Sequence, residues 1–212
     1  MTMVERDVGL AAELVDMMAA DQAVWVPVLQ AMTEPEHADA FERRYCESNQ
    51  WDMRTYTEWE IGALDVVLRY RNVHATNAAR LRSIVDAVGW PSRSLVGEDA
   101  ADAAWLLLQH LGDSAFQRKC LEFMKALPAP ERDLKHYAFT FDLLCKVEGR
   151  LPKFGTMGPD VEDREGLDQL RAEYDLPLLS LQEDERARGH VVMPCGIGRR
   201  TEGFGWPHRE RE

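Results

Sequence analysis

One histidine, His110, ends an apolar segment in the middle of the chain, with Gln109 before it and Asp113 three residues after it. At the C-terminus of a predicted helix the helix dipole favours a protonated imidazole, and a nearby carboxylate adds to this effect. His110 is therefore the candidate general acid or base, with Asp113 or Asp142 as the carboxylate that orients it. The alternative is structural, with His110 capping the last carbonyls of its helix and Asp113 capping the next helix.

Four more polar or aromatic residues are candidates for holding a substrate. His74 and Asn77 are three residues apart and share one helical face, so they form either a buried hydrogen-bonded pair or a ligand-facing pair. The amide of Gln117, like that of Gln109, either binds a polar ligand or satisfies backbone groups. Trp90 lies in a Gly-Trp-Pro turn, which acts either as a packing device or as a platform for a ligand.

None of the common metal or cofactor motifs is present in the sequence. It has no H-E-x-x-H and no C-x-x-C pair, no G-x-G-x-x-G after a strand, no P-loop and no G-x-S-x-G elbow. We therefore expect metal-free chemistry without a cofactor. The four cysteines are far apart and are predicted to be free thiols; Cys120 and Cys145 are candidate nucleophiles, but both fall on apolar helix faces where inert core cysteines are usual.

Composition limits the partners and the location. The chain has 212 residues, of which 45% are hydrophobic, so it can bury one substantial core. The net charge of −12 and the pI near 5.0 disfavour nucleic acid as a partner. The sequence has no long uncharged apolar run and no signal peptide, and its cysteines are unpaired, so we expect a cytoplasmic protein without membrane contact.

The apolar residues follow a helical spacing along most of the chain. The predicted helices cover residues 10–25, 33–51, 55–88, 100–111, 113–127 and 134–147. Pro27 is expected to end the first helix, and the third is long enough to be two helices kinked near Asn72. Leu68, Val88 and Phe123 are assigned to the core. The prediction is an all-α fold of about six helices in a single domain, residues 1–180, followed by an irregular, glycine-rich C-terminal extension, residues 181–212.

A series of short motifs runs from Asn77 to about Leu179. Its elements, in order, are Gly89-Trp90-Pro91, Val96-Gly97, Gln109-His110, Asp113 with Gln117, Asp142, and Phe154-Gly155-Thr156. In order and spacing they resemble an uncharacterised bacterial family, domain of unknown function six-six-two-four. The Asp21-Gln22 pair also resembles an N-terminal element of that family. The resemblance implies a fold and a candidate site but no reaction.

The chain departs from the family pattern at several polar positions. It has Leu143 where the family has arginine, Pro152 and Met157 where it has glutamine, Phe154 where it has tyrosine, and Trp25 where an arginine is expected. Polar positions have thus become apolar together. This pattern indicates either a pocket rebuilt for a less polar ligand or an activity that has decayed.

Two functions of different classes are consistent with these residues. The first is a small enzyme, of the kind found in specialised metabolism, in which His110 moves a proton while the reaction hydrolyses, transfers a group to, or cyclises a small polar or amphipathic substrate. The second is a non-catalytic subunit that binds a ligand or completes a partner protein. The enzyme is the favoured interpretation, because Gln109, His110 and Gln117 are retained.

Overall fold

The computed structural model describes residues 5–33, 58–158 and 160–179, and within them it contains helices and loops but no strand. This confirms the all-α fold class. Backbone contacts divide the chain into two compact units, residues 1–133 and 134–212, and each is described below by itself. The division falls inside the region for which the sequence predicts one helical domain. The predicted helix over 33–51, apart from its first residue, and the whole of the C-terminal extension, residues 181–212, lie outside the described residues.

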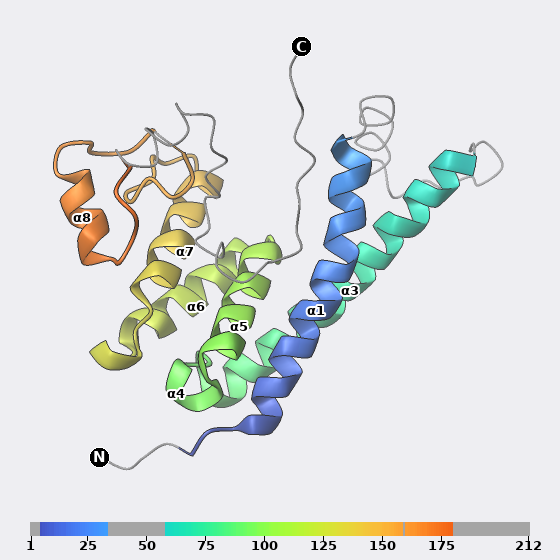
Figure 1. Cartoon of the computed structure of the whole chain (residues 1–212), viewed down its shortest axis with the longest axis horizontal. Coiled ribbons are helices and arrows are strands. Elements are labelled where there is room, and N and C mark those ends of the chain that lie inside the picture. Colours follow the sequence, from blue (N-terminus) through green and yellow to red (C-terminus); the bar gives the residue numbers. More distant parts are fainter. Residues whose placement is uncertain (1–4, 34–57, 159, 180–212) are drawn as a thin grey trace. The chain divides into compact units, whose positions relative to one another are not determined.

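Two long helices and a shorter one dominate the first unit. They are α1 (Val8–Thr33), α3 (Glu58–Val88) and α5 (Glu98–His110), and each of the three contacts the other two. Figure 1 shows α1 and α3 side by side along much of their length. Among the described residues this unit also contains α4 (Arg93–Val96), α6 (Ser114–Ala126) and the short 3₁₀ helix η2 (Ala129–Glu131).

Both predicted interruptions of the long helices are wrong. α1 continues through Pro27 to Thr33, so the loss of one backbone donor at proline does not end this helix. α3 is one helix with no break near Asn72, because residues 63–88 contain neither glycine nor proline. It ends at Gly89, whose φ of 75° belongs to the left-handed region that glycine adopts without a steric penalty.

The core of the first unit lies where the three helices meet. The predicted inner face of α5 is confirmed, since Ala101, Ala104, Trp105 and Leu108 are all buried. Small alanine side chains allow neighbouring helices to approach closely. Three core assignments are wrong: the side chains of Leu68, Val88 and Phe123 are exposed. Val67 and Val85 take the inward positions on α3, and Leu68 falls on the side of the helix opposite the buried Leu81 and Ile84. Val88 shares the face of Leu81 and Ile84 but is exposed as the last residue of the helix.

α1 and α3 run antiparallel, and their register is set by contacts that recur about once per helical turn. From one end to the other, the contacting pairs are Glu13–Arg80, Met17–Asn77, Asp21–His74 and Trp25–Tyr70. The first is a two-pronged ion pair, and the second is a 3.1 Å hydrogen bond from the Asn77 amide to the Met17 carbonyl. The register therefore places Asp21 directly opposite His74.

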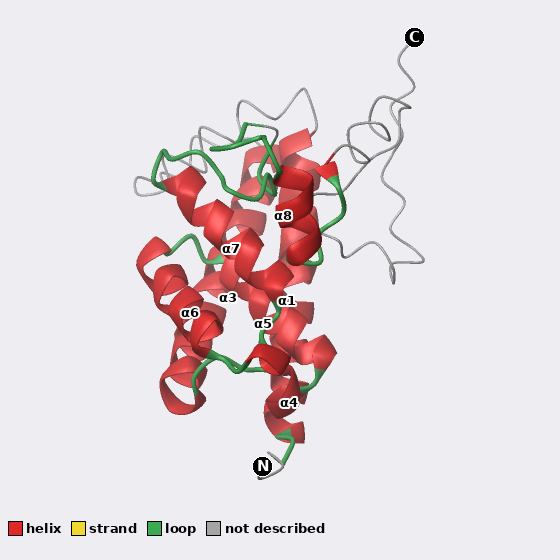
Figure 2. Ribbon diagram, turned by 90° about the vertical axis from the view of Figure 1, so that its left-hand side faces the viewer, coloured by secondary structure: helices red, strands yellow, loops and turns green. Residues whose placement is uncertain are grey.

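The second unit contains α7 (Leu134–Val147) and α8 (Leu167–Glu173), separated by irregular chain that is green in Figure 2. The bounds of α7 match the prediction, whereas the seven-residue α8 is not predicted. Two buried charged side chains hold the irregular chain. Asp142 accepts hydrogen bonds from the backbone N–H groups of residues 153, 154 and 156 and from the Thr156 hydroxyl. Arg171 donates to the carbonyls of Phe154 and Pro177.

In the described part of the chain, none of the helices combines the length and apolarity that crossing a membrane requires.

Candidate functional site

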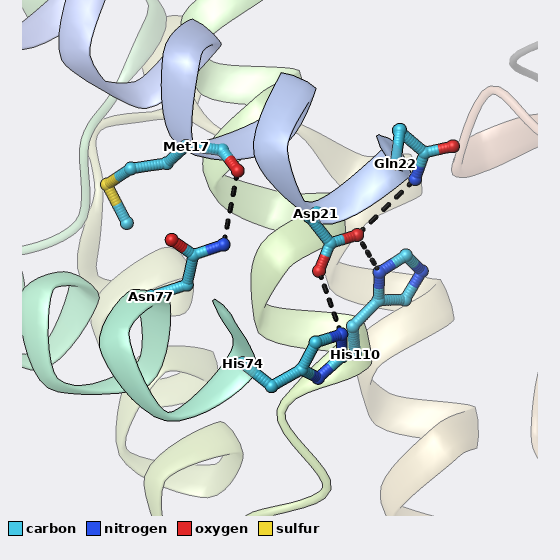
Figure 3. Close-up of polar contacts among 6 residues, drawn as sticks. All are labelled: Met17, Asp21, Gln22, His74, Asn77 and His110. Atoms are coloured by element: carbon cyan, nitrogen blue, oxygen red, sulfur yellow. Dashed lines mark hydrogen bonds and ion pairs between the residues drawn. The ribbon is translucent and has the colours of Figure 1, made fainter. Parts of the chain in front are cut away.

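Three ionisable side chains from three different helices meet in the first unit. Asp21 comes from α1, His74 from α3, and His110 is the last residue of α5. Figure 3 shows both imidazoles turned toward the Asp21 carboxylate. We call Asp21, His74 and His110 the histidine–aspartate cluster.

Each carboxylate oxygen of Asp21 contacts a different imidazole. Oδ2 lies 2.7 Å from Nδ1 of His110, and Oδ1 lies 3.0 Å from Nε2 of His74. The Gln22 side-chain amide donates a longer, 3.4 Å hydrogen bond to Oδ2. The Asp21 side chain is 2% exposed, whereas those of His74 and His110 are 13% and 18% exposed. The carboxylate is therefore enclosed, while the two imidazoles keep some contact with the surface.

Asp21 is ionised at neutral pH in spite of its burial. Burial by itself raises the pKa of this carboxyl, but the hydrogen bond from His110, the contact with His74 and the attraction of both rings outweigh burial and bring the pKa from 3.8 to about 2. Because an ionised carboxylate can only accept hydrogen bonds, Nδ1 of His110 must carry a proton to donate to it. When the ring is neutral, this leaves Nε2 of His110 with a free lone pair.

Aromatic rings fix the planes of both imidazoles. Trp25 stacks on His110 with ring centroids 5.4 Å apart, and Tyr70 lies against His74 at 3.9 Å. The two imidazoles are nearly parallel, with an interplanar angle of 11°. The indole ring of Trp25 thus covers one face of the His110 imidazole.

Two buried amides fix the helices that carry the cluster. Asn77 ties α3 to α1 one turn away from the contact between His74 and Asp21. Gln117, which is 1% exposed on α6, donates a 3.0 Å hydrogen bond to the Leu108 carbonyl in the last turn of α5. This carbonyl lies at the helix end, where it also accepts a long, 3.4 Å hydrogen bond from the Leu111 backbone N–H. Both amides thus satisfy backbone groups, which was one of the two alternatives for Gln117.

Both carboxylates proposed from the sequence as partners of His110 have other roles in the structure. Asp113 caps α6 by accepting from the Phe116 N–H and forms an ion pair with Arg82. The hydrogen bond from Phe116 and the Arg82 guanidinium lower the pKa of Asp113. Asp142 belongs to the second unit, where its oxygens bind the loop after α7. The carboxylate that contacts His110 is Asp21.

Two predicted site residues remain to be placed. Gln109 is half-buried on α5 next to His110, and Trp90 is 5% exposed in the core. Of the eight predicted site residues, the structure thus brings His74 and His110 together, with Asn77 one turn away from them.

Sequence reasoning from residue types missed Asp21 as a site residue, although the family resemblance includes it. A signal was present: Leu10, Leu14, Met17 and Asp21 follow one another at helical spacing, so a charged residue occupies the apolar stripe of α1. Charged residues are seldom fully buried unless they are paired. The cluster also offers two imidazoles and a carboxylate to a metal ion, a donor set that no sequence motif reveals because it is dispersed over three helices.

The two cysteines in the described residues are unsuited to nucleophilic chemistry. Cys120 and Cys145 are buried free thiols. Burial raises the pKa of Cys120 to about 12 and also raises that of Cys145. A thiol is reactive as the thiolate, and these side chains stay protonated at neutral pH.

We predict that Cys120 reacts very slowly with thiol reagents in the folded protein. The pKa of about 12, against an ordinary value of 9.0, reduces the thiolate fraction at pH 8 by about a thousandfold. Labelling by a disulfide reagent, followed by peptide mass spectrometry in a chain with Cys46 and Cys195 replaced by serine, should be slower by at least that factor than in denaturant. Rapid labelling of Cys120 in the native state would show that the site is open to solvent.

Comparison with known proteins identifies the family of the chain. The profile of the family of unknown function DUF6624 matches residues 29–177, a stretch that includes His74 and His110 and begins after Asp21. No curated protein and no solved structure matches the chain. Since the profile covers well over half of the sequence, the chain belongs to the family of unknown function DUF6624.

Proposed function

We propose that this protein is an enzyme in which His110 moves a proton to or from a small-molecule substrate, while Asp21 orients and charges the imidazole. One observation carries the proposal: a buried, ionised carboxylate lies 2.7 Å from Nδ1 of an imidazole that is partly open to solvent. A carboxylate in this position fixes the tautomer and the orientation of the ring and stabilises the imidazolium that forms during proton transfer. Nε2 of His110 is then the atom that takes up and returns the proton.

His74 supports the same centre from the opposite side of the carboxylate. Its Nε2 atom contacts Oδ1 of Asp21, so the two imidazoles hold the carboxylate in place between α3 and α5. The ring stacking of Trp25 and Tyr70 restricts rotation of the imidazoles, which supports a preorganised geometry. The same aromatic surface is suited to a substrate with an apolar part, in line with the loss of polar residues relative to the family pattern.

The reaction is hydrolysis, group transfer or internal cyclisation, each of which needs a positioned acid or base. The enzyme would act in the cytoplasm, a setting supported by the buried free thiols. A role in biosynthesis would fit an enzyme of this kind. In the second candidate function, the protein binds a ligand without transforming it, or completes a partner subunit, and the experiment below separates these functions.

Replacement of His110 by glutamine is expected to abolish turnover. Glutamine can still donate a hydrogen bond to Asp21 but cannot exchange a proton, so the rate should fall by at least about a hundredfold. The purified protein is incubated with a metabolite extract, and substrates are found by mass spectrometry as species that disappear while products accumulate. We expect the wild-type chain and Asp113→Asn to convert the same species, and His110→Gln to convert none.

Asp113→Asn is the matched control because asparagine also caps helices and Asp113 does not contact the cluster. Conversion that is equally fast in His110→Gln would contradict the proposed role of this histidine. A metabolite that is retained by the wild-type protein without conversion, or a partner chain that copurifies with it in native mass spectrometry, would instead favour the binding or accessory function.

A further inference from the structure

The histidine–aspartate cluster has the donors of a transition-metal site. One nitrogen of each imidazole and one oxygen of Asp21 lie within 4.8 Å of one another. The nitrogens that face the carboxylate are Nε2 of His74 and Nδ1 of His110. Because these donors come from α1, α3 and α5, all of which contact one another, a rigid helical frame holds them together.

One of these donor atoms, Nε2 of His74, lacks a well-aligned hydrogen bond within the described part of the chain. Nε2 of His74 is fully buried, and among the described residues it has no aligned hydrogen-bond partner. Its 3.0 Å contact with Oδ1 of Asp21 is an approach of the two atoms without hydrogen-bond alignment. A buried nitrogen whose contact with a carboxylate lacks hydrogen-bond alignment is incompletely satisfied, and a metal ion between the two groups would satisfy both.

The chemistry of the donors favours some cations over others. Imidazole nitrogen suits Zn²⁺, Cu²⁺, Ni²⁺ and Fe²⁺, whereas Mg²⁺ and Ca²⁺ prefer sites built from oxygen. Two histidines and one carboxylate also form the protein part of zinc sites that keep a fourth position open. In a tetrahedral zinc site, neighbouring donor atoms lie about 3.3 Å apart. The two nitrogens now contact different oxygens of the carboxylate, at 2.7 and 3.0 Å, and all three donors lie within 4.8 Å of one another. Reaching the tetrahedral spacing therefore needs changes of at most about 1.5 Å in the distances between donors.

We propose that Asp21, His74 and His110 bind a zinc ion, and that the bound ion switches off the acid–base role of His110. The ion takes the position of the proton on Nδ1 of His110, so a neutral ring must carry its only proton on Nε2. Nε2 then has no lone pair with which to act as a base. The inference that zinc switches off His110 rests on the proposed function. The inference that zinc binds rests on the geometry of the donor atoms alone.

Zinc binding is tested on the full chain after treatment with a chelator. With uniform ¹⁵N labelling, long-range histidine spectra distinguish Nδ1 from Nε2 of each ring and show which nitrogen a metal occupies. We expect one equivalent of Zn²⁺ to shift Nδ1 of His110 and Nε2 of His74, and Mg²⁺ to leave both unchanged. Signals that stay in place, or that shift only at other histidines, would overturn the inference without recourse to any variant.

Variants distinguish the residues that bind zinc from residues that only lie near the site. Asp21→Asn and His74→Gln should each weaken zinc binding by at least a hundredfold in competition with a coloured chelator, whereas Asp113→Asn should bind as the wild type does. Co²⁺ provides a second measurement, because its visible absorption reports a four- or five-coordinate site when it replaces Zn²⁺. Equal affinity in Asp21→Asn and the wild type would exclude the carboxylate as a ligand.

The two proposals fail in distinguishable ways. If Zn²⁺ binds as expected and slows conversion of a metabolite that the chelated enzyme transforms, both stand. If no zinc binds while His110→Gln still abolishes conversion, the zinc site is refuted and the acid–base role remains. If conversion requires zinc, the switching role is refuted. If zinc binds at the two nitrogens and no metabolite is converted with or without it, the proposed enzyme fails while the binding site remains.

Discussion

At pH 7, the free energy of unfolding of the Asp21→Asn variant is expected to be about 3 kcal/mol lower than that of the wild-type protein. The pKa of Asp21 falls from 3.8 to about 2 on folding, and a shift of this size corresponds to about 2.5 kcal/mol. The asparagine amide also fits less well than the carboxylate between the two imidazoles, which adds to the loss of stability. Chemical denaturation followed by circular dichroism measures the difference.

The effect should depend on pH with a defined sign. Because the pKa of Asp21 is lower in the folded than in the unfolded chain, the stabilisation is present in full above about pH 5 and is lost as the pH falls toward about 2. The gap between wild type and Asp21→Asn should therefore shrink over that range. Asp16→Asn is the control, since Asp16 is exposed on the same helix and its replacement should change stability by less than about 0.5 kcal/mol. A gap that stays constant with pH would mean that the carboxylate is not held as an ion.

A second large loss of stability is expected from a substitution in the second unit, residues 134–212. Asp142→Ala should destabilise the fold by about 4 kcal/mol, because it removes four hydrogen bonds to a fully buried carboxylate and leaves three backbone N–H groups without their acceptor. Urea denaturation gives the total loss. Hydrogen exchange at the amides of residues 153, 154 and 156 shows whether it arises in this loop.

The matched control for Asp142 is Asp160→Ala. Asp160 is an exposed aspartate in the same unit, so its removal should be close to neutral. Asp142→Asn keeps one acceptor oxygen in place and should lose less stability than the alanine variant. Unchanged exchange at the three amides in Asp142→Ala would show that the loop is held by other contacts, of which the Arg171 hydrogen bonds are the strongest alternative.

Local patterns in the sequence predicted the helices well, and they failed where tertiary packing overrides a local signal. α7 was predicted with its bounds, because Pro130 before it and Gly149 after it coincide with an apolar repeat. Pro27 predicts an end to α1, but this helix, which packs on α3 and α5, continues through the proline. α8 was missed because seven residues are too few for a helical period to be recognised.

The sequence predicts only part of the candidate site, because the site is assembled by tertiary packing. His74, Asn77 and His110 stand out by residue type and position, and two of them belong to the cluster. The identity of the carboxylate could not follow from spacing, because Asp21 and His110 are 89 residues apart and meet only through the packing of α1 on α5. Asp113 is close to His110 in sequence, but its place at the start of α6 commits it to capping that helix.

The distance along the chain between Asp21 and His110 also has a consequence for synthesis on the ribosome. The aspartate is made 89 residues before its partner, which at about 5–20 residues per second is a delay of about 4–18 seconds. Leu10 and Leu14 on α1 are buried in the finished fold, in which α1 contacts both α3 and α5, and α3 is made first. The contact of Asp21 with His74 on α3 can therefore form first, and the cluster is completed only when His110 at the end of α5 has been made.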